Sequence, residues 1–186
     1  MTAKIKLNAA SGGGSFSLQA PSSSSNARVM TLPDTADGTI LTTTNPKAGN
    51  IIQVVRTDIA NTGITTNSTS FVSMNVSVSI TPSSTSSNVF ILLTGGGTYL
   101  PVATSFAYVT VYRGSTNLGD STTGLESFYS TGNVQMIVPH SLSVLDHPNT
   151  TSATTYTIYA RCINGTYQFQ NTDRAHAFLT AMEVAG

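Results

Sequence analysis

Hydrophobic and polar residues alternate along most of the chain, which is the period-2 pattern of a half-buried β-strand. The clearest example is residues 72–80, where apolar side chains at every second position are separated by Ser and Asn. Apolar residues at helical spacing are not sustained for ten residues anywhere, and only residues 175–182 offer a weak helical alternative. The pattern therefore predicts an all-β protein.

Residues 50–186 contain nine candidate strands separated by turn signals, which is the arrangement of an antiparallel β-sandwich. These strands are residues 51–56, 72–80, 89–93, 105–112, 134–138, 142–145, 155–163, 166–170 and 175–184. We expect one or two of them to be bulged or merged, which leaves about eight strands. This part of the chain is predicted to be a compact head domain.

Residues 1–47 differ from the rest because short extended pieces are separated there by Gly, Ser and Pro. Apolar residues within these pieces are predicted to hold the segment in an assembly; they are Ile5, Leu7, Phe16, Leu18, Met30 and Leu32. A lone short hairpin is marginally stable in water, so the pieces need partners. We therefore predict an extended β arm whose simplest partners are the same segments of sister chains.

The Asn-Gly pair at residues 164–165 predicts a hairpin, because both positions of a type I′ turn need positive φ. Counting outward from this turn pairs Cys162 with Tyr167 and Ala160 with Phe169. Small residues opposite large aromatic rings would make a packed, inward-pointing face. We expect Cys162, the single cysteine, to be a buried small hydrophobe rather than a reactive thiol.

Composition and charge limit the classes of function. The chain has 24 Ser and 30 Thr, and only 9% of its residues are charged. Its net charge is zero and its basic residues do not cluster, which argues against nucleic-acid binding. No apolar run is long enough to span a bilayer, and the N-terminus lacks the apolar core of a signal peptide. We expect a protein made in a cytoplasm, without membrane insertion, whose near-neutral surface favours association.

The search for catalytic or metal-binding motifs yields weak candidates. His140, His147 and His176 are the possible acid–base or metal-binding residues, and Asp146 beside His147 is a possible second ligand or an acid that orients the imidazole. Adjacent residues on a strand point to opposite faces, however. We expect these residues to cap turns and pair strands, and we predict no metal and no cofactor.

Glycan-cleaving enzymes need two carboxylates on either side of the scissile bond. The close carboxylate pair in a connection of the main domain is Asp120 and Glu126, and their spacing carries no geometric constraint. We therefore predict no enzyme, and a glycan-cleaving tailspike-type enzyme stays as the alternative from another class.

Residues 114–132 are predicted to form a long connection that contacts a receptor. Its candidate contact residues are Leu125, Phe128 and Tyr129, because exposed aromatic rings with hydroxyl neighbours suit contact with carbohydrate or protein. The alternative, in which Phe128 and Tyr129 pack on the core or on a neighbouring subunit, is left open.

Two parts of the chain resemble phage proteins. Residues 4–9 (KIKLNA), 12–14 (GGG), 16–21 (FSLQAP), 32–33 (LP), 37–38 (DG) and 41–43 (LTT) resemble a motif common in phage tail fibres, where it is associated with intertwined trimeric shafts. Residues 51–54 (IIQV), 70–72 (SFV), 79–82 (SITP), 112–114 (YRG), 155–157 (TYT) and 183–184 (EV) are similar to heads of marine and cyanobacterial phage fibres. Such heads look like trimeric, tumour-necrosis-factor-like jelly rolls.

The resemblance implies a homotrimer on the virion surface, assembled in the host cytoplasm as a tail fibre or knob. Its expected partners are other tail or capsid proteins and, at the host, a surface glycan or protein. The family pattern has no catalytic residues to transfer. Because the chain starts almost directly in shaft-like sequence, a capsid decoration (cement) trimer with residues 1–47 reaching along the shell remains an alternative.

Overall fold

The computed structural model describes residues 4–8, 11–19, 22–23, 25, 46–59, 63–131, 136–169 and 176–186. It divides into two units, Met1–Ile40 and Leu41–Gly186. The domain boundary expected at residues 47–50 stays a prediction, because residues 41–45 lie outside the described part of the chain.

The first unit contains an antiparallel hairpin of β1 (Lys4–Asn8) and β2 (Ser15–Gln19). Ile5 pairs with Leu18, so these two side chains share one face of the ribbon.

Leu7 lies on the same face as Ile5, two residues further along β1, and its register partner is Phe16. Ile5 and Leu7 are 65% and 58% exposed. Two other predicted arm residues, Met30 and Leu32, lie outside the described residues.

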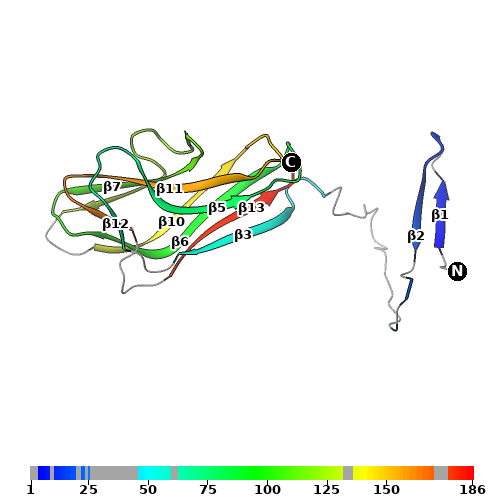
Figure 1. Ribbon diagram of the computed structural model, residues 1–186, viewed down its shortest axis with the longest axis horizontal. Coiled ribbons are helices and arrows are strands. Elements are labelled where there is room, and N and C mark those ends of the chain that lie inside the picture. Colours follow the sequence, from blue (N-terminus) through cyan, green and yellow to red (C-terminus); the bar gives the residue numbers. More distant parts are fainter. Residues whose placement is uncertain are drawn as a thin grey trace, which may run out of the picture. The chain divides into compact units, whose positions relative to one another are not determined.

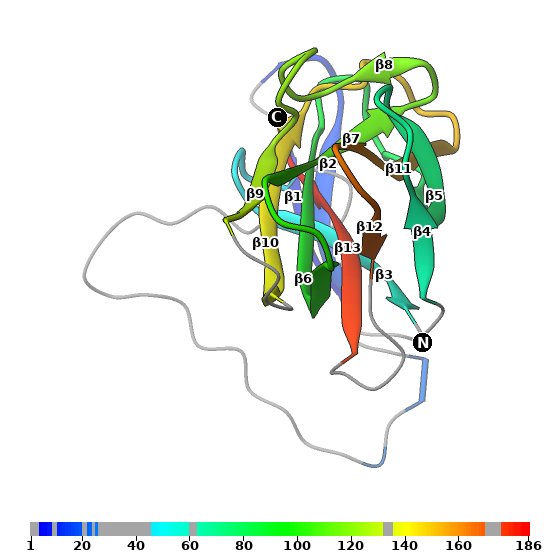
Figure 2. The same cartoon turned by 90° about the vertical axis from the view of Figure 1, so that its left-hand side faces the viewer.

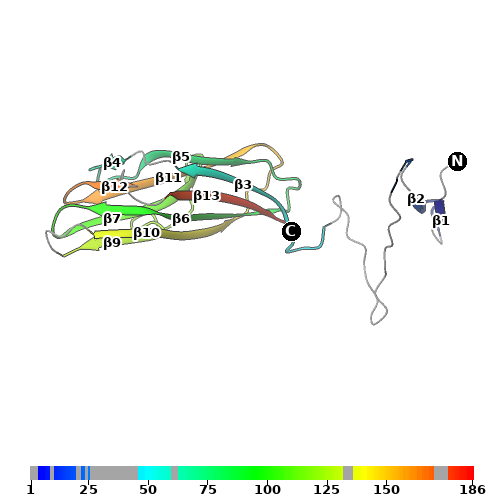
Figure 3. The same ribbon diagram turned by 90° about the horizontal axis from the view of Figure 1, so that it is seen from below.

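The second unit consists of two antiparallel sheets around one core, seen as two layers in Figure 1. Sheet I comprises β3 (Ile51–Ile59), β4 (Ile64–Thr66), β6 (Asn88–Leu100), β10 (Met136–Asp146), β12 (Tyr167–Phe169) and β13 (Ala177–Val184). Sheet II comprises β5 (Val72–Ile80), β7 (Ser105–Arg113), β8 (Thr116–Asn117), β9 (Glu126–Ser130) and β11 (Thr154–Ile163). The strands of both sheets run in roughly the same direction, as in an aligned sandwich (Figure 3).

The strand order is that of an eight-stranded jelly roll. Sheet I runs β10-β6-β13-β3, with β12 and β4 continuing beyond the ends of β13 and β3, and β10, β6 and β13 lie side by side in Figure 2. Sheet II runs β5-β11-β7-β9, with β8 beside the other end of β7. The predicted antiparallel, jelly-roll-like sandwich is therefore confirmed.

Most of the predicted strands are present, with some changes of extent. Residues 136–138 of one expected segment and residues 142–145 of the next belong to one strand, β10, with a bulge between Val138 and His140, while residues 134–135 lie outside the described residues. The weak helical alternative at 175–182 is wrong, since β13 occupies residues 177–184. Three short strands, β4, β8 and β9, were not predicted, because two to five residues are too few for an alternation to stand out.

The hairpin predicted at residues 164–165 is wrong, although the turn itself has the expected positive φ at both positions. Strand β11 lies between β5 and β7 in sheet II, whereas β12 lies between β4 and β6 in sheet I. Both hydrogen-bonding edges of β11 are therefore occupied by β5 and β7, which are longer than β12. The turn at residues 164–165 carries the chain from sheet II to sheet I.

The inward orientation predicted for this region is confirmed. Cys162 is 1% exposed, and Ala160, Tyr167 and Phe169 are completely buried. The small and aromatic side chains therefore meet across the core rather than side by side in one sheet. Burial raises the pKa of the Cys162 thiol, as expected for a structural cysteine.

Glu183 of β13 is a buried carboxylate held by neutral donors. It accepts hydrogen bonds from Gln53 Nε2 (2.6 Å) and from the backbone nitrogen and hydroxyl of Ser83 (2.7 and 2.6 Å). Burial by itself raises the pKa of this carboxyl, but the hydrogen bonds outweigh it, and the pKa of Glu183 lies below its ordinary value. Glu183 thereby fastens the connection between β5 and β6 to sheet I.

Replacing Glu183 with Gln is expected to lower the free energy of unfolding at neutral pH by about 1–3 kcal/mol, because the charge-assisted hydrogen bonds are lost. Since the folded-state pKa is lowered, the carboxylate stabilises the fold above its unfolded-state pKa. This stabilisation is lost as the pH falls through the folded-state pKa. Urea unfolding at a series of pH values between about 6 and about 3 should show a smaller acid-induced loss for the variant. Equal pH slopes for both proteins would contradict this role.

Candidate functional site

The outer face of sheet II is rich in aromatic side chains. The chain has seven Phe and seven Tyr, and six of these residues lie on this surface around one arginine. This surface, called the aromatic face below, consists of Phe71, Phe106, Tyr108, Tyr112, Tyr129, Tyr159 and Arg161. Their neighbours along β7, β9 and β11 point inward, so the strand alternation places these side chains on the outside.

The rings of the aromatic face form two adjoining groups. Phe106 and Tyr129 are register partners on β7 and β9, and their ring centroids are 4.3 Å apart. Tyr108, two residues along β7, lies 6.3 Å from Phe106 with its ring almost parallel, at 3°. Tyr112 and Tyr159 form the second group, with ring centroids 4.0 Å apart.

Arg161 joins the two groups. Its guanidinium lies 4.7 Å from the centroid of the Tyr108 ring and 5.4 Å from that of Phe71, whose ring also contacts Tyr112. Its Nη1 donates a hydrogen bond to the carbonyl of Thr69 (3.2 Å). These contacts hold the guanidinium in place on the surface.

The residues predicted to form a receptor-contacting loop are placed differently by the structure. Residues 126–130 form strand β9, not a loop. Phe128 points into the core and is 7% exposed, whereas Leu125 is partly buried and packs against the same core. Tyr129 is 46% exposed and belongs to the aromatic face. The contact role stays a prediction for Leu125 and Tyr129.

His140, a candidate catalytic or metal-binding residue, is buried between the sheets. Its Nδ1–H donates to Glu126 Oε2 (2.7 Å), and its Nε2 lies 3.1 Å from Thr98 Oγ1 and 3.2 Å from the Tyr167 hydroxyl. The ring also stacks on Phe169 at 4.8 Å. The His140–Glu126 pair therefore joins β10 of sheet I to β9 of sheet II.

The two carboxylates considered for glycan cleavage are engaged in separate contacts. Glu126 bonds to His140 and also accepts from the backbone nitrogen of Ser141 (2.9 Å). Asp120 accepts hydrogen bonds from the backbone nitrogens of Thr122 and Thr123, and the bond from Thr123 contributes most to lowering the pKa of Asp120. Asp120 thus caps its own turn, and the geometry does not bring the two carboxylates together as an acid–base pair.

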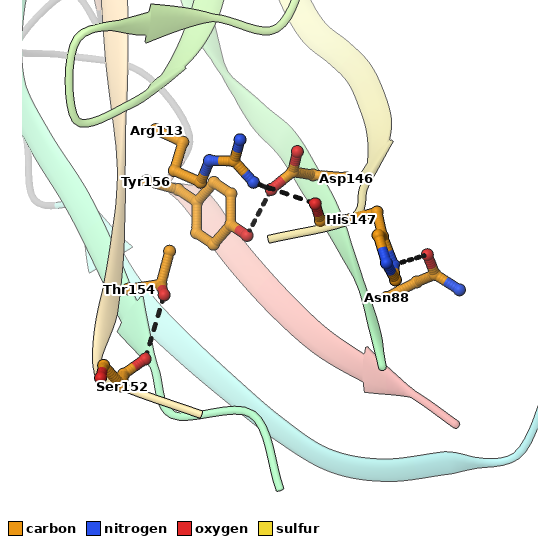
Figure 4. Close-up of polar contacts among 7 residues, drawn as sticks. All are labelled: Asn88, Arg113, Asp146, His147, Ser152, Thr154 and Tyr156. Carbon is orange, nitrogen blue, oxygen red and sulfur yellow. Dashed lines mark hydrogen bonds and ion pairs between the residues drawn. The ribbon is translucent and has the colours of Figure 1, made fainter. Parts of the chain in front are cut away.

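A second polar cluster joins the sheets where β7 and β10 end (Figure 4). Asp146 accepts hydrogen bonds from Arg113 Nη1 (3.0 Å) and from the Tyr156 hydroxyl (2.8 Å). Burial, followed by the bond to Asp146, raises the pKa of Tyr156. His147 points outward and its Nδ1 lies 3.1 Å from Asn88 Oδ1, so the adjacent Asp146 and His147 face opposite ways, as expected.

In the described part of the chain, no group of three or more His, Cys, Asp or Glu side chains is arranged to hold a metal ion. Among the same residues, no helix has the length and apolarity to cross a membrane.

The outer face of sheet I carries an apolar row that crosses four strands. Val54, Met182, Phe90 and Leu145 are successive register partners on β3, β13, β6 and β10. Val54 is 57% exposed and Leu145 is 59% exposed, while Met182 and Phe90 are partly buried. The sequence holds a signal for this apolar row, since residues 89–93 are continuously apolar, as in strands covered on both faces.

No protein-family model matches the chain, and no curated protein matches it. Among solved structures, it is similar to the infectious bursal disease virus VP2 subviral particle, at 12% identity and a TM-score of 0.42 over 86% of this chain. The T=1 particles derived from that virus match at 11% identity and a TM-score of 0.37 over 86% of this chain. The chain spans 38% and 41% of the lengths of these two proteins. At TM-scores below 0.5, we draw no functional conclusion from either similarity.

Proposed function

We propose that the chain is a non-enzymatic structural protein of a bacteriophage particle, forming a homotrimeric fibre or knob on the virion surface whose head contacts the host. The observation that carries the proposal is the apolar surface that a single copy leaves exposed. This surface occurs on both units of the chain, on the β1–β2 hairpin and on the apolar row of sheet I.

The β1–β2 hairpin supports assembly through the arm. Ile5, Leu7 and Leu18 lie on one face of a two-stranded ribbon and are exposed. A two-stranded ribbon has no second layer of its own and is marginal in water. The same segments of sister chains supply such a layer, as in the intertwined shafts that residues 4–43 resemble.

The apolar row supports assembly through the head. Val54 and Leu145 are both more than half exposed at opposite edges of sheet I, and partly buried Met182 and Phe90 join them. Contiguous apolar surface of this kind marks an interaction site, and covering a Val or Leu side chain contributes about 1.5–3 kcal/mol. Copies packed through this row bury it, and the zero net charge opposes their approach little.

Replacing Leu145 with Glu is expected to weaken the assembly, because the interface between heads then buries an unpaired carboxylate. Light scattering should give about 58 kDa for the wild-type protein, three times the 19.4 kDa chain mass, and a lower average mass for the variant, in which only the arm still joins the copies. The matched control is Ser79→Glu, which adds the same charge at an exposed position of β5 in sheet II and should remain trimeric. A wild-type protein that is monomeric at micromolar concentration contradicts the proposal.

A further inference from the structure

We propose that the aromatic face of sheet II binds an acidic glycan, with Arg161 contacting a sugar carboxylate and the neighbouring rings contacting the C–H faces of the sugars. This inference names the class of ligand for the host-contacting surface, and it rests on the proposed function.

The aromatic face lies on the opposite side of the sandwich from the apolar row. The outer face of sheet I holds the apolar row, whereas the aromatic face belongs to the outer face of sheet II. Packing of copies through sheet I therefore leaves the aromatic face open to a ligand. Phe106 and Tyr129 are the most exposed of its rings, and they lie at one end of β7 and β9.

Charge complementarity indicates an acidic partner. Arg56 pairs with Asp58 and Arg113 pairs with Asp146, but Arg161 has no ion pair among the described residues. Asp120 is influenced by the charge of Arg161 only weakly, and its carboxylate is already bonded within its own turn. The Nε of Arg161 is buried without a partner and its Nη1 donates to Thr69. The terminal nitrogens of the guanidinium are therefore the donors that a carboxylate can reach, and their planar geometry matches it.

The form of the surface favours a glycan over a protein. Five of the six rings lie on strands β7, β9 and β11, and Phe106 and Tyr108 are side by side on β7 at an angle of 3°. A protein hot spot instead fills a well-packed pocket. Ser73, Thr157 and Ser127 are the polar neighbours on the same face, and their hydroxyls match those of a sugar in both donating and accepting.

The test is calorimetric titration of the full chain with three carboxylated oligosaccharides, of galacturonate, mannuronate and sialate units, and with a neutral maltose oligomer. We expect at least one acidic oligomer to bind and the neutral one to bind at least tenfold more weakly. Raising the salt from about 0.02 M to about 0.5 M should weaken this binding. Because the chain has no Trp, tyrosine fluorescence is a second readout of ligand over the rings.

Two variants and one control make the test specific. Arg161→Gln should weaken binding about tenfold and remove its salt dependence, and Tyr129→Ala should weaken it about fivefold. Arg56→Gln is the control, because Arg56 also lies over an aromatic ring, that of Phe178 at 4.6 Å, but already has a carboxylate partner. It should bind like the wild type.

The outcomes separate this inference from the proposed function. The glycan site is overturned, and a protein partner favoured, if none of the three acidic oligomers binds. The same conclusion follows if acidic and neutral oligomers bind equally and Arg161→Gln does not change their affinity. Light scattering on the same samples reports assembly separately. A trimer that fails to bind contradicts the glycan site alone, and a monomer that binds through Arg161 contradicts the trimer alone.

Discussion

Replacing Asp146 with Ala is expected to lower the free energy of unfolding of the head by about 2–4 kcal/mol, because a buried phenol loses its acceptor and a partly buried ion pair is broken. The side chain of Asp146 is 8% exposed and bonds to Arg113 and Tyr156 across the two sheets. Its removal leaves the buried Tyr156 phenol without its acceptor and leaves the Arg113 guanidinium with the carbonyl of His147 as its remaining acceptor. Urea unfolding followed by circular dichroism, at matched protein concentration, measures the loss.

The control for this prediction is the exposed ion pair of Arg56 and Asp58. Its Nε–Oδ1 distance is 2.8 Å, shorter than the 3.0 Å of the Arg113–Asp146 pair, but its side chains are 55% and 61% exposed. Replacing Asp58 with Ala should therefore cost only about 0–1 kcal/mol. Similar losses of unfolding free energy for Asp146→Ala and Asp58→Ala would show that neither burial nor the link between the sheets determines how much an ion pair stabilises the head.

Replacing His140 with Leu is expected to cost about 3 kcal/mol or more, although the side chains are of similar size. Thr98 and Tyr167 lose a hydrogen-bond partner in the core, and Glu126 keeps only the backbone nitrogen of Ser141. A buried polar group left unsatisfied costs about 1–3 kcal/mol. The loss should appear as a lower denaturation midpoint with an unchanged slope.

Glu126→Gln is the matched variant for the same cluster. Its amide oxygen still accepts a hydrogen bond from His140 or from the backbone nitrogen of Ser141, so the expected cost is about 1 kcal/mol. If His140→Leu unfolds at the wild-type midpoint, the cluster does not stabilise the closure of the sandwich between β9 and β10.

Alternation along the sequence predicts which way a side chain points but not which strand lies beside it. Residues 74–80 and Cys162 behave as predicted, because orientation depends only on neighbours along the chain, whereas Val72 at the start of β5 is exposed. The pairing predicted around residues 164–165 is wrong, because strand pairing does not depend only on neighbours along the chain. Which strand lies beside β11 is decided by β5 and β7, segments far away in the sequence.

Most of the candidate binding surfaces could not be predicted from the sequence, because they combine residues from strands that are far apart along the chain. Tyr129 was predicted as a contact residue, but its stacking partner Phe106 lies on another strand. A sign was available in residues 105–112, where aromatic side chains occupy positions of the alternation that usually carry polar residues. The bond between Glu126 and His140 likewise depends on the closure of two sheets, which no local pattern encodes.

The central claim, a trimeric protein on the outside of a phage particle, is tested most directly by imaging intact virions with a gold-labelled antibody against the head domain. The account predicts label on the tail, on fibres whose density accommodates three copies of the chain. Label spread over the head shell in hundreds of copies per particle would replace the fibre by the decoration protein. Absence of the chain from the particle would contradict the account altogether.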